Sequence, residues 1–251
     1  VMGLADGGLG AGMTFDVVII GGGIIGSAAA HFLARANGGA KVAVIEPDPS
    51  YAAATTPQGA GGVRQLFSRP ENVAMSRYSL AFYENFAALV GDDAYRPSID
   101  FKKQGYLFVV GAAGAATLER NAGLQRSLGA AVEVIDVAGL RARFPSLGTD
   151  DVALGCYSPD DGWVDPFMAL QGFRKSAERR GASYLKERVV ALEAQGPAVR
   201  AATLASGKVV KADIFINAAG PWASEVAAMV GASLPVVPMP RAHRAAAANQ
   251  G

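Results

Sequence analysis

The sequence predicts an α/β fold built on a parallel β-sheet. The strongest evidence is the pattern of residues 16–46. Residues 16–20 are a short apolar segment of the kind that forms a buried strand, followed by a glycine turn and a helical segment to about Arg35. Residues 41–46 then form a second strand that ends in Ile-Glu. A strand, a turn, a helix and a strand in this order make a βαβ unit with a right-handed crossover.

The rest of the chain continues the α/β pattern. A capping box from Ser68 to Glu71 is expected to open one helix that runs to Gly91, and Asp136 and Asp165 are expected to cap two later helices. We expect residues 189–194, 199–204 and 208–210 to form a small antiparallel meander, and residues 212–217 to form a separate buried strand.

The composition excludes several classes of function. Of the 251 residues, 51% are hydrophobic, which is enough for a substantial core. The 23 Lys and Arg residues nearly balance the 22 Asp and Glu residues, so we expect no nucleic-acid partner. One cysteine and two histidines exclude an internal disulfide and argue against a histidine- or cysteine-built metal site or a Ser-His-Asp triad, so we expect no metal.

No segment predicts membrane insertion or secretion. Residues 17–30 are apolar apart from Ser27, but this stretch is too short to span a bilayer and is interrupted by three glycines. The first basic residue, Arg35, comes after the stretch, whereas a secretory signal carries positive charge before it. We therefore expect a soluble, cytoplasmic protein with a disordered leader at residues 1–13, in which Met13 is a candidate native start.

The glycine turn has the pattern of a dinucleotide site. Gly21-Gly-Gly-Ile-Ile-Gly26 fits G-x-G-x-x-G, in which Gly21 permits a tight turn, Gly23 lets the backbone approach a pyrophosphate, and Gly26 lets the helix pack on the strand. The helix N-terminus offers free N–H groups to the phosphates. Glu46 follows Gly26 at the distance at which a carboxylate accepts from a ribose hydroxyl. An acid there favours FAD or NAD over NADP, and the βαβ unit does not separate FAD from NAD.

Six stretches of the chain together resemble the D-amino-acid-oxidase-like superfamily of FAD enzymes, which includes glycine oxidase, sarcosine oxidase and dimethylglycine dehydrogenase. They occur in family order within residues 14–241: residues 16–46, 61–72 (GGVRQLFSRPEN), 105–107 (GYL), 161–166 (DGWVDP), 216–222 (INAAGPW) and 234–238 (LPVVP). The resemblance implies a Rossmann-like, glutathione-reductase-like FAD/NAD(P)-binding domain interleaved with an incomplete α+β substrate domain. It places the FAD domain at residues 14–84 and 146–235, and part of the substrate domain at 85–145 and 236–251.

The resemblance also implies contacts with FAD. Thr55 and Thr56 are expected at the pyrophosphate, Gly61, Gly62 and Arg64 beside the isoalloxazine ring, and the backbone of Val189 at the adenine. Ala218, Ala219, Gly220 and Trp222 are expected to close over the cofactor, because small residues after a buried strand let the backbone approach a ligand. With the βαβ unit, the expected cofactor-binding residues are Gly21, Gly23, Ile25, Gly26, Glu46, Thr55, Thr56, Gly61, Gly62, Arg64, Val189, Ala218, Ala219, Gly220 and Trp222.

The implied activity is oxidation of a C–N bond in an amino acid or N-methylated amine, with hydride transfer to flavin N5 and hydrolysis of the resulting imine. The FAD is expected to be non-covalent, because residues 50–68 contain no histidine and no cysteine follows Cys156. Family members continue beyond the point where this sequence stops, so the end after Arg241 is expected to be truncated or altered. Two alternatives remain open: a non-catalytic flavin-binding assembly or chaperone-like protein, and an NAD-dependent dehydrogenase. The substrate, the oligomeric state and the electron acceptor (oxygen, a quinone or an electron-transfer protein) also remain open.

Several polar residues have a functional and a structural interpretation. Arg64 is the candidate catalytic residue, placed to orient a substrate carboxylate or stabilise reduced flavin, and the alternative is a surface or phosphate-facing arginine. Cys156 and His31 are interpreted as packing residues, Asp161 as a turn residue and Asp165 as a helix cap. Trp222 is interpreted either as a shield over the cofactor or as a core aromatic.

Overall fold

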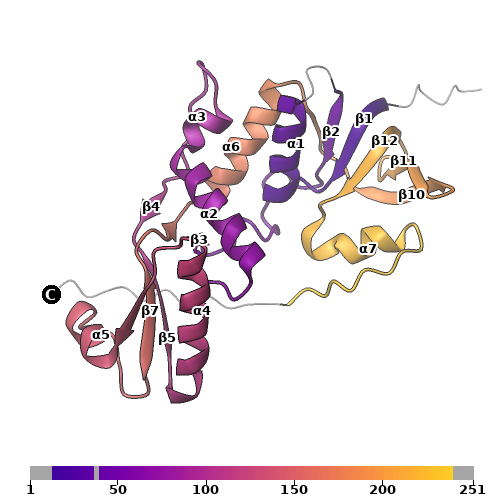
Figure 1. Ribbon diagram of the computed structural model, residues 1–251. Coiled ribbons are helices and arrows are strands. Elements are labelled where there is room, and N and C mark those ends of the chain that lie inside the picture. Colours follow the sequence, from indigo (N-terminus) through magenta and orange to yellow (C-terminus); the bar gives the residue numbers. More distant parts are fainter. Residues whose placement is uncertain (1–12, 37–39, 240–251) are drawn as a thin grey trace, which may run out of the picture. The chain divides into compact units, whose positions relative to one another are not determined.

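The computed structural model describes residues 13–36 and 40–239, which form two compact units (Figure 1). One unit joins the residues before Gly61 to those after Ala169, and the other is Gly61–Ala169. The predicted leader, except for Met13, and the predicted altered end after Arg241 lie outside the described residues.

The first unit contains a six-stranded mixed sheet with the order β10-β11-β12-β1-β2-β9. The strands β12, β1, β2 and β9 are parallel, whereas β10 and β11 extend the sheet in antiparallel fashion. This arrangement confirms the predicted α/β fold. The strand bounds are β1 Met13–Ile20, β2 Val42–Ile45, β9 Ser183–Leu185, β10 Val189–Gln195, β11 Ala198–Leu204 and β12 Val209–Asn217.

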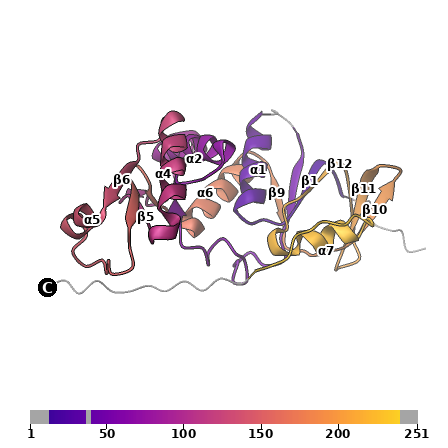
Figure 2. The same cartoon turned by 60° about the horizontal axis from the view of Figure 1, so that its bottom comes forward.

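Successive residues of β1 face opposite sides of this sheet, so each side has its own core. Val17 and Ile19 pack with Ala30 of α1 (Ile24–Ala36) and with Ala177 of α6 (Pro166–Arg179). Val18 and Ile20 belong to the other core, which includes residues of β10 to β12 and one residue of α7 (Ala223–Ala228). Figures 1 and 2 show α1 and α7 on different sides of β1 and β12.

The long strand β12 corrects one prediction. Residues 208–210 and 212–217 were expected to be two strands, but Val209–Asn217 is one strand of nine residues. Its first part pairs with β11 while Met13 to Ile20 of β1 pair along nearly its whole length. Because β1 supplies hydrogen bonds past the end of β11, the backbone stays extended where the sequence suggested a break.

The second unit contains two small sheets, β3-β8-β4 and β5-β7-β6. Leu118 and Ala122 of α4 pack with Cys156 of β7, and Figure 1 shows α4 beside β5 and β7. The bounds are β3 Gly62–Val63, β4 Lys102–Lys103, β5 Tyr106–Val110, β6 Glu133–Asp136, β7 Leu154–Ser158, β8 Gly162–Trp163, α2 Pro70–Glu84, α3 Phe86–Val90, α4 Ala115–Ser127 and α5 Val137–Arg143, with 3-10 turns at Ala112–Gly114 and, in the first unit, Gly220–Trp222.

The helix caps are partly as expected. Asp136 Oδ1 accepts from the Gly139 N–H at 2.7 Å and Asp165 Oδ1 accepts from the Met168 N–H at 2.9 Å, which confirms both caps. The capping box at Ser68 is wrong, because α2 begins at Pro70 with Arg69 at the cap position and no side-chain cap bond. The expected single helix also breaks at Asn85, whose side-chain amide donates to the Ala81 carbonyl. Asparagine side chains compete for backbone groups in this way.

The compact units divide the chain at Gly61 and after Ala169. The domains predicted from the sequence divide it at residues 84/85 and 145/146. They are defined by function, which packing alone does not reveal, so these boundaries remain a prediction. None of the helices in the described part of the chain is both long enough and apolar enough to cross a membrane.

Candidate cofactor site

The glycine turn joins the end of β1 to the start of α1, and its backbone is tightly enclosed at two of the three motif positions. Gly21 has a φ of +102°, and a Cβ there would lie 2.5 Å from the Ala218 carbonyl oxygen. A Cβ at Gly26 would lie 1.9 Å from the Gly21 carbonyl oxygen. Backbone contacts therefore require glycine at both positions, with the segment after β12 at Gly21 and with the turn itself at Gly26.

Gly23 differs from the other two glycines. The nearest atom to a Cβ at this position is Thr56 Oγ1, at an ordinary contact distance of 3.7 Å. Since the protein itself leaves room for a side chain here, packing does not explain why this position is glycine. A ligand that must approach the backbone at the start of α1 does explain it.

Glu46 follows β2 and contacts this turn. Its Oε2 accepts from the Gly22 N–H at 2.8 Å, and its Oε1 accepts from the Asp48 N–H at 2.9 Å. A carboxylate has about four acceptor positions, so each oxygen keeps one for a further donor. The half-buried Glu46 is thus fixed at the edge of the glycine turn and retains the capacity to bind a sugar hydroxyl.

Thr56 lies at the N-terminus of α1. Its Oγ1 accepts from the Ile24 N–H at 3.3 Å, and Thr55 beside it is exposed. The next residue of the helix, Ile25, has 72% of its surface exposed. The first N–H groups of a helix have no partner within it, and they carry partial positive charge. The turn, Glu46 and Thr56 therefore fit a dinucleotide diphosphate with its adjoining ribose.

The segment after β12 lies against the same turn. The Ala218 N–H donates to the Ile20 carbonyl at 2.8 Å, and Asn217 holds the next residues through the Ala219 N–H and the Ala223 carbonyl. Gly220 has a φ of +53°, and Trp222 is 47% exposed, so it is not a core aromatic. Small residues thus follow β1 and β12 side by side, and such residues let a backbone approach a ligand.

Val189 is the first residue of β10, and its side chain is buried in the core of the first unit. Its expected contact with adenine through the backbone stays a prediction. The structure therefore places twelve of the expected residues in the first unit, and brings Gly21, Gly26, Glu46, Thr56 and Ala218 together around one turn.

Gly61, Gly62 and Arg64 belong to the second unit. A Cβ at Gly61 would lie 2.2 Å from the Val164 carbonyl oxygen, and one at Gly62 would lie 3.0 Å from the Tyr106 ring, so local packing accounts for both glycines. The Arg64 guanidinium lies over three aromatic rings, with its Cζ 4.9 Å from the centroid of Phe67 and 5.5 Å from those of Tyr106 and Phe108. Its Nε is buried and has no hydrogen-bond partner in the described part of the chain.

The other polar residues are structural. His31 is fully buried beside Phe32 and Phe173, and its Nδ1 is 3.0 Å from Ser176 Oγ. Burial, with Arg180 and Arg35 nearby, lowers the pKa of His31 to about 4, so the ring is neutral near pH 7. Cys156 is buried as expected, and burial raises the pKa of its thiol. No cluster of potential metal ligands occurs among residues 13–36 and 40–239.

Asp161 is not the turn residue that the sequence suggested. It is fully buried, and its two carboxylate oxygens accept from the backbone N–H of Gln65 at 2.9 Å and from Gln65 Nε2 at 3.1 Å. Burial raises the pKa of this carboxyl despite those bonds. The partner lies 96 positions away in the sequence, which explains why the Asp-Gly pair alone suggested a turn.

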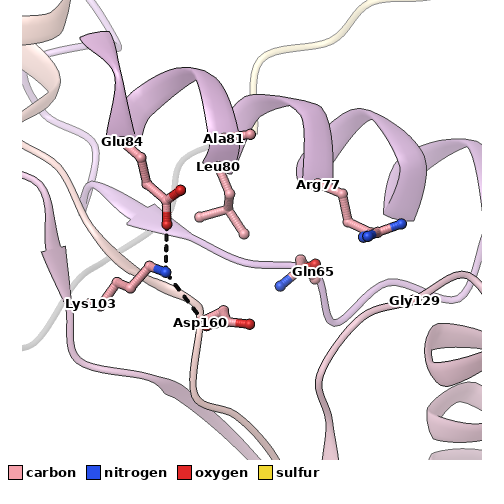
Figure 3. Close-up of a pocket in the computed structure, with 8 residues that line it drawn as sticks. All are labelled: Gln65, Arg77, Leu80, Ala81, Glu84, Lys103, Gly129 and Asp160. Carbon is pink, nitrogen blue, oxygen red and sulfur yellow. Dashed lines mark ion pairs between the residues drawn. The ribbon is translucent and has the colours of Figure 1, made fainter. Parts of the chain in front are cut away.

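A groove of about 250 Å³ lies within the second unit, and Figure 3 shows charged side chains along it. Lys103 Nζ pairs with Glu84 at 2.5 Å and with Asp160 at 3.5 Å, and Arg77 donates to the Leu128 carbonyl. Because these charges pair with groups of the protein itself, the groove does not have the character of a diphosphate site.

Sequence reasoning missed the residues that support the glycine turn. Ser27 Oγ donates to the Gly22 carbonyl at 2.8 Å, and Tyr184 donates in turn to Ser27 Oγ at 3.1 Å. Tyr51 and Arg174 form a further contact behind this turn. Pairs separated by 157 and 123 positions leave no signal in one sequence, although Ser27 itself lies directly after Gly26.

A parallel sheet with a glycine turn, a carboxylate after the second strand and small residues after the last strand defines a dinucleotide-binding type of domain. The chain matches the family described as DAO, FAD dependent oxidoreductase, over residues 16–250, and it belongs to this family. Membership confirms the resemblance and implies FAD as the cofactor.

Two groups of relatives show which members of the family the chain resembles in sequence. The chain is 36% identical over 241 residues to FAD-dependent oxidoreductase domain-containing protein 1 of Xenopus laevis, covering 86% of this chain and 48% of that protein. It is 29% identical to mitochondrial dimethylglycine dehydrogenase of Rattus norvegicus, covering 89% of this chain and 25% of that protein. The chain thus spans about half the length of the relatives of the first kind. Within the superfamily, the chain is thus similar to the group typified by FAD-dependent oxidoreductase domain-containing protein 1.

The solved structures agree with the fold. L-proline dehydrogenase from P. horikoshii superposes with a TM-score of 0.77 at 28% identity, covering 88% of this chain and 57% of that chain. Glycine oxidase from Geobacillus kaustophilus has a TM-score of 0.76 at 22% identity, covering 88% of this chain and 60% of that chain, and it supports the fold alone.

Proposed function

We propose that the chain binds FAD non-covalently and contributes the cofactor half of an oxidoreductase that oxidises a C–N bond of an amino acid or N-methylated amine. The observation that carries the proposal is Gly23, a position at which the protein has room for a side chain. The N–H groups of its two neighbours, Gly22 and Ile24, bond to Glu46 and Thr56. The α1 N–H groups bind the diphosphate, and Glu46 accepts from the adenosine ribose.

The remaining expected contacts form part of the same proposal. Ile25 and Thr55 lie at the diphosphate end, Val189 lies at the adenine, and Ala218 to Gly220 with Trp222 cover the cofactor beside the turn. Gly61 and Gly62 lie at the flavin ring. The functional domains are then residues 14–84 with 146–235 for FAD, and residues 85–145 with 236–251 for part of the substrate domain.

Non-covalent attachment is supported by the residues available. Residues 50–68 contain no histidine, and Cys156, the single cysteine, is buried in the core of the second unit. A thiol must be exposed to attack the ring, and the thiol of Cys156 is buried.

Arg64 is proposed to bind the carboxylate of the substrate or to stabilise negative charge on the reduced ring. Its guanidinium is held by three aromatic rings, which fix a cation without neutralising it. A cation that is positioned in this way has donors left for a carboxylate, which guanidinium binds in a bidentate manner.

When bound, FAD supplies the hydride acceptor at its N5 atom. The protein has to orient the amine and exclude water from the reacting carbon. A substrate whose amine is neutral needs no side-chain base. This suits the described residues, whose one histidine is buried beside α6 and neutral.

Names of relatives support the substrate class. Dimethylglycine, sarcosine and L-proline dehydrogenases are named for secondary or tertiary amines that also carry a carboxylate. A carboxylate beside the oxidised C–N bond is the feature that Arg64 would recognise.

Anaerobic reduction of bound flavin tests the function. Purified chain loaded with FAD is mixed with sarcosine, dimethylglycine, L-proline, glycine and D-amino acids, and the flavin absorbance is followed. Bleaching by one of these amines is the expected result, and reoxidation with oxygen, a quinone or an electron-transfer protein then identifies the acceptor class. Tight FAD binding without bleaching by any amine supports the non-catalytic assembly protein instead, and a colourless protein that requires a nicotinamide supports the NAD-dependent dehydrogenase.

The role of Arg64 has a matched control. Arg64→Gln is expected to raise the amine concentration for half-maximal bleaching at least about tenfold, the loss typical of a charge-assisted bond, and to weaken FAD binding by a smaller factor. Arg69→Gln removes an exposed arginine five positions later and is expected to change nothing. Equal behaviour of the two variants would exclude the carboxylate role.

A further inference from the structure

The loop between Glu46 and Thr56 touches the glycine turn at both of its ends. Glu46 Oε2 accepts from the Gly22 N–H, and Thr56 Oγ1 accepts from the Ile24 N–H. Between them, the Asp48 carboxylate accepts from the backbone N–H groups of Ser50 and Ala52. The loop is therefore ordered by its own hydrogen bonds, and its conformation determines where the Glu46 carboxylate and the Thr56 hydroxyl lie.

Tyr51 is the buried residue of this loop. It is 1% exposed, and it adopts a φ of +59°, the left-handed region that residues with a Cβ seldom occupy. Its N–H donates to the Asp48 carbonyl and its own carbonyl accepts from the Ala54 N–H, so two consecutive turns meet at this residue. Strain of this kind persists only where surrounding contacts enforce it, and it concentrates at functional sites.

The Tyr51 hydroxyl reaches the glycine turn from behind. A Cβ on Gly22 would lie 3.3 Å from this oxygen and 2.9 Å from Glu46 Cβ. Gly22 is thus enclosed by both residues of the loop. A shift of the Tyr51 ring would move Gly22, whose N–H is bonded to the carboxylate proposed to bind the ribose.

Arg174 of α6 holds Tyr51 in this place. Its Nη1 donates to the Tyr51 hydroxyl at 3.3 Å and to the Pro49 carbonyl at 3.5 Å, while its Nε pairs with Glu178 at 3.0 Å. The guanidinium also lies over the Tyr184 ring, 4.9 Å from its centroid. Tyr184 in turn donates to Ser27, which holds the Gly22 carbonyl. One guanidinium therefore contacts Tyr51, which lies beside Gly22, and Tyr184, which supports Gly22 through Ser27.

We propose that Tyr51 and Arg174 are positioning residues for the dinucleotide site, which set the place of the Glu46 to Thr56 loop on the glycine turn and thereby the affinity for the ADP half of the cofactor. The proposal rests on the proposed function, because it assumes that this turn binds FAD. Neither side chain has to touch the ligand. Both act through Gly22, Glu46 and Thr56.

The test measures affinity and stability in the same variants. Tyr51→Phe keeps the ring and its packing and removes the hydroxyl, and Arg174→Gln removes the charge. Both are expected to weaken FAD binding and the competing binding of ADP by about three- to tenfold, the usual loss for one hydrogen bond. Arg174→Lys is expected to fall between wild type and Arg174→Gln, because lysine can still donate to Tyr51 but does not stack in the same way.

A double-mutant cycle separates positioning from general destabilisation. The Tyr51→Phe/Arg174→Gln double variant is expected to bind ADP about as well as the weaker single variant, since both changes remove one coupled contact. Tyr157→Phe is the control, because Tyr157 also packs under an arginine, with Arg143 Cζ 4.1 Å from its ring, but lies in the second unit. The control is expected to bind FAD and ADP as wild type does.

The outcomes are distinguishable. Wild type that fails to bind FAD refutes the proposed function before any variant is measured. A second outcome is that wild type binds FAD, while Tyr51→Phe and Arg174→Lys bind ADP as tightly as wild type and only their unliganded Tm falls. This result overturns the positioning role and leaves the pair purely structural. If Arg174→Gln does not fold, the comparison of wild type with Tyr51→Phe and Arg174→Lys decides the matter.

Discussion

The Gly23→Ala variant separates the effect of this position on folding stability from its effect on FAD binding. In the unliganded chain, the added methyl group meets only Thr56 Oγ1, at 3.7 Å, and Gly23 has no positive φ. Replacing glycine by alanine at such a position reduces the entropy of the unfolded chain and stabilises a protein by about 0.4–1 kcal/mol. The free energy of unfolding of Gly23→Ala is therefore expected to equal or exceed that of wild type.

The same methyl group occupies the space through which a diphosphate reaches the α1 N–H groups. We expect the affinity for FAD to fall at least about tenfold, equivalent to about 1.4 kcal/mol. Gly26→Ala is the contrasting variant, because its Cβ would lie 1.9 Å from the Gly21 carbonyl oxygen and the turn would have to open by roughly 1 Å in a close-packed region. It is expected to lose both stability and FAD binding.

The assay combines thermal unfolding without ligand and titration of flavin fluorescence with protein. A Gly23→Ala variant that is as stable as wild type and binds FAD with unchanged affinity would refute the reasoning, since the diphosphate would then not approach this backbone. A Gly23→Ala variant as unstable as Gly26→Ala would refute the steric distinction between the two glycines.

Three further variants test single residues. Glu46→Gln leaves one acceptor oxygen for the N–H groups of Gly22 and Asp48, so FAD affinity should fall at least about fivefold; unchanged titration curves would exclude the ribose role. Asp161→Asn places a donor against the Gln65 donors and should cost about 1–3 kcal/mol of unfolding free energy, measured in urea, whereas Asp160→Asn, in the exposed neighbour, should cost less. The pKa of His31 is lower in the folded chain than in the unfolded chain, so the unfolded state binds the proton first as pH falls. The free energy of unfolding of wild type should therefore fall by at most about 3 kcal/mol between pH 6.5 and 4, and that of His31→Gln should fall by less. Parallel pH profiles of the two proteins would contradict burial of a neutral ring.

Features that depend on neighbouring residues were predictable from the sequence. The glycine turn, the helix caps at Asp136 and Asp165, and the first two parallel strands each arise from contacts within a few positions, or from a periodic pattern of apolar residues. The side-chain acid Glu46 was recognisable because its distance from Gly26 is fixed by the length of one helix and one strand.

Features that depend on distant partners were not predictable. Asp161 and Asp165 are the same residue type four positions apart, yet one is a helix cap and the other is a buried acceptor for Gln65. The cap follows from the sequence because its acceptor and donor are three positions apart. The buried role follows only from the sheet that brings residues 65 and 161 together, and one sequence carries no record of that contact.

The same distinction applies within the candidate site. Glu46 and Thr56 were predicted from motif and resemblance, whereas the sequence did not single out Tyr51, which lies between them. Its proposed role rests on three features of the folded chain: its burial, its positive φ, and the contact with Arg174, 123 positions away. A residue with strained backbone and almost no exposed surface restricts the loop to few conformations. The loop therefore presents Glu46 and Thr56 in fixed positions before any ligand binds, and a preorganised site of this kind avoids the entropic cost of ordering them on binding.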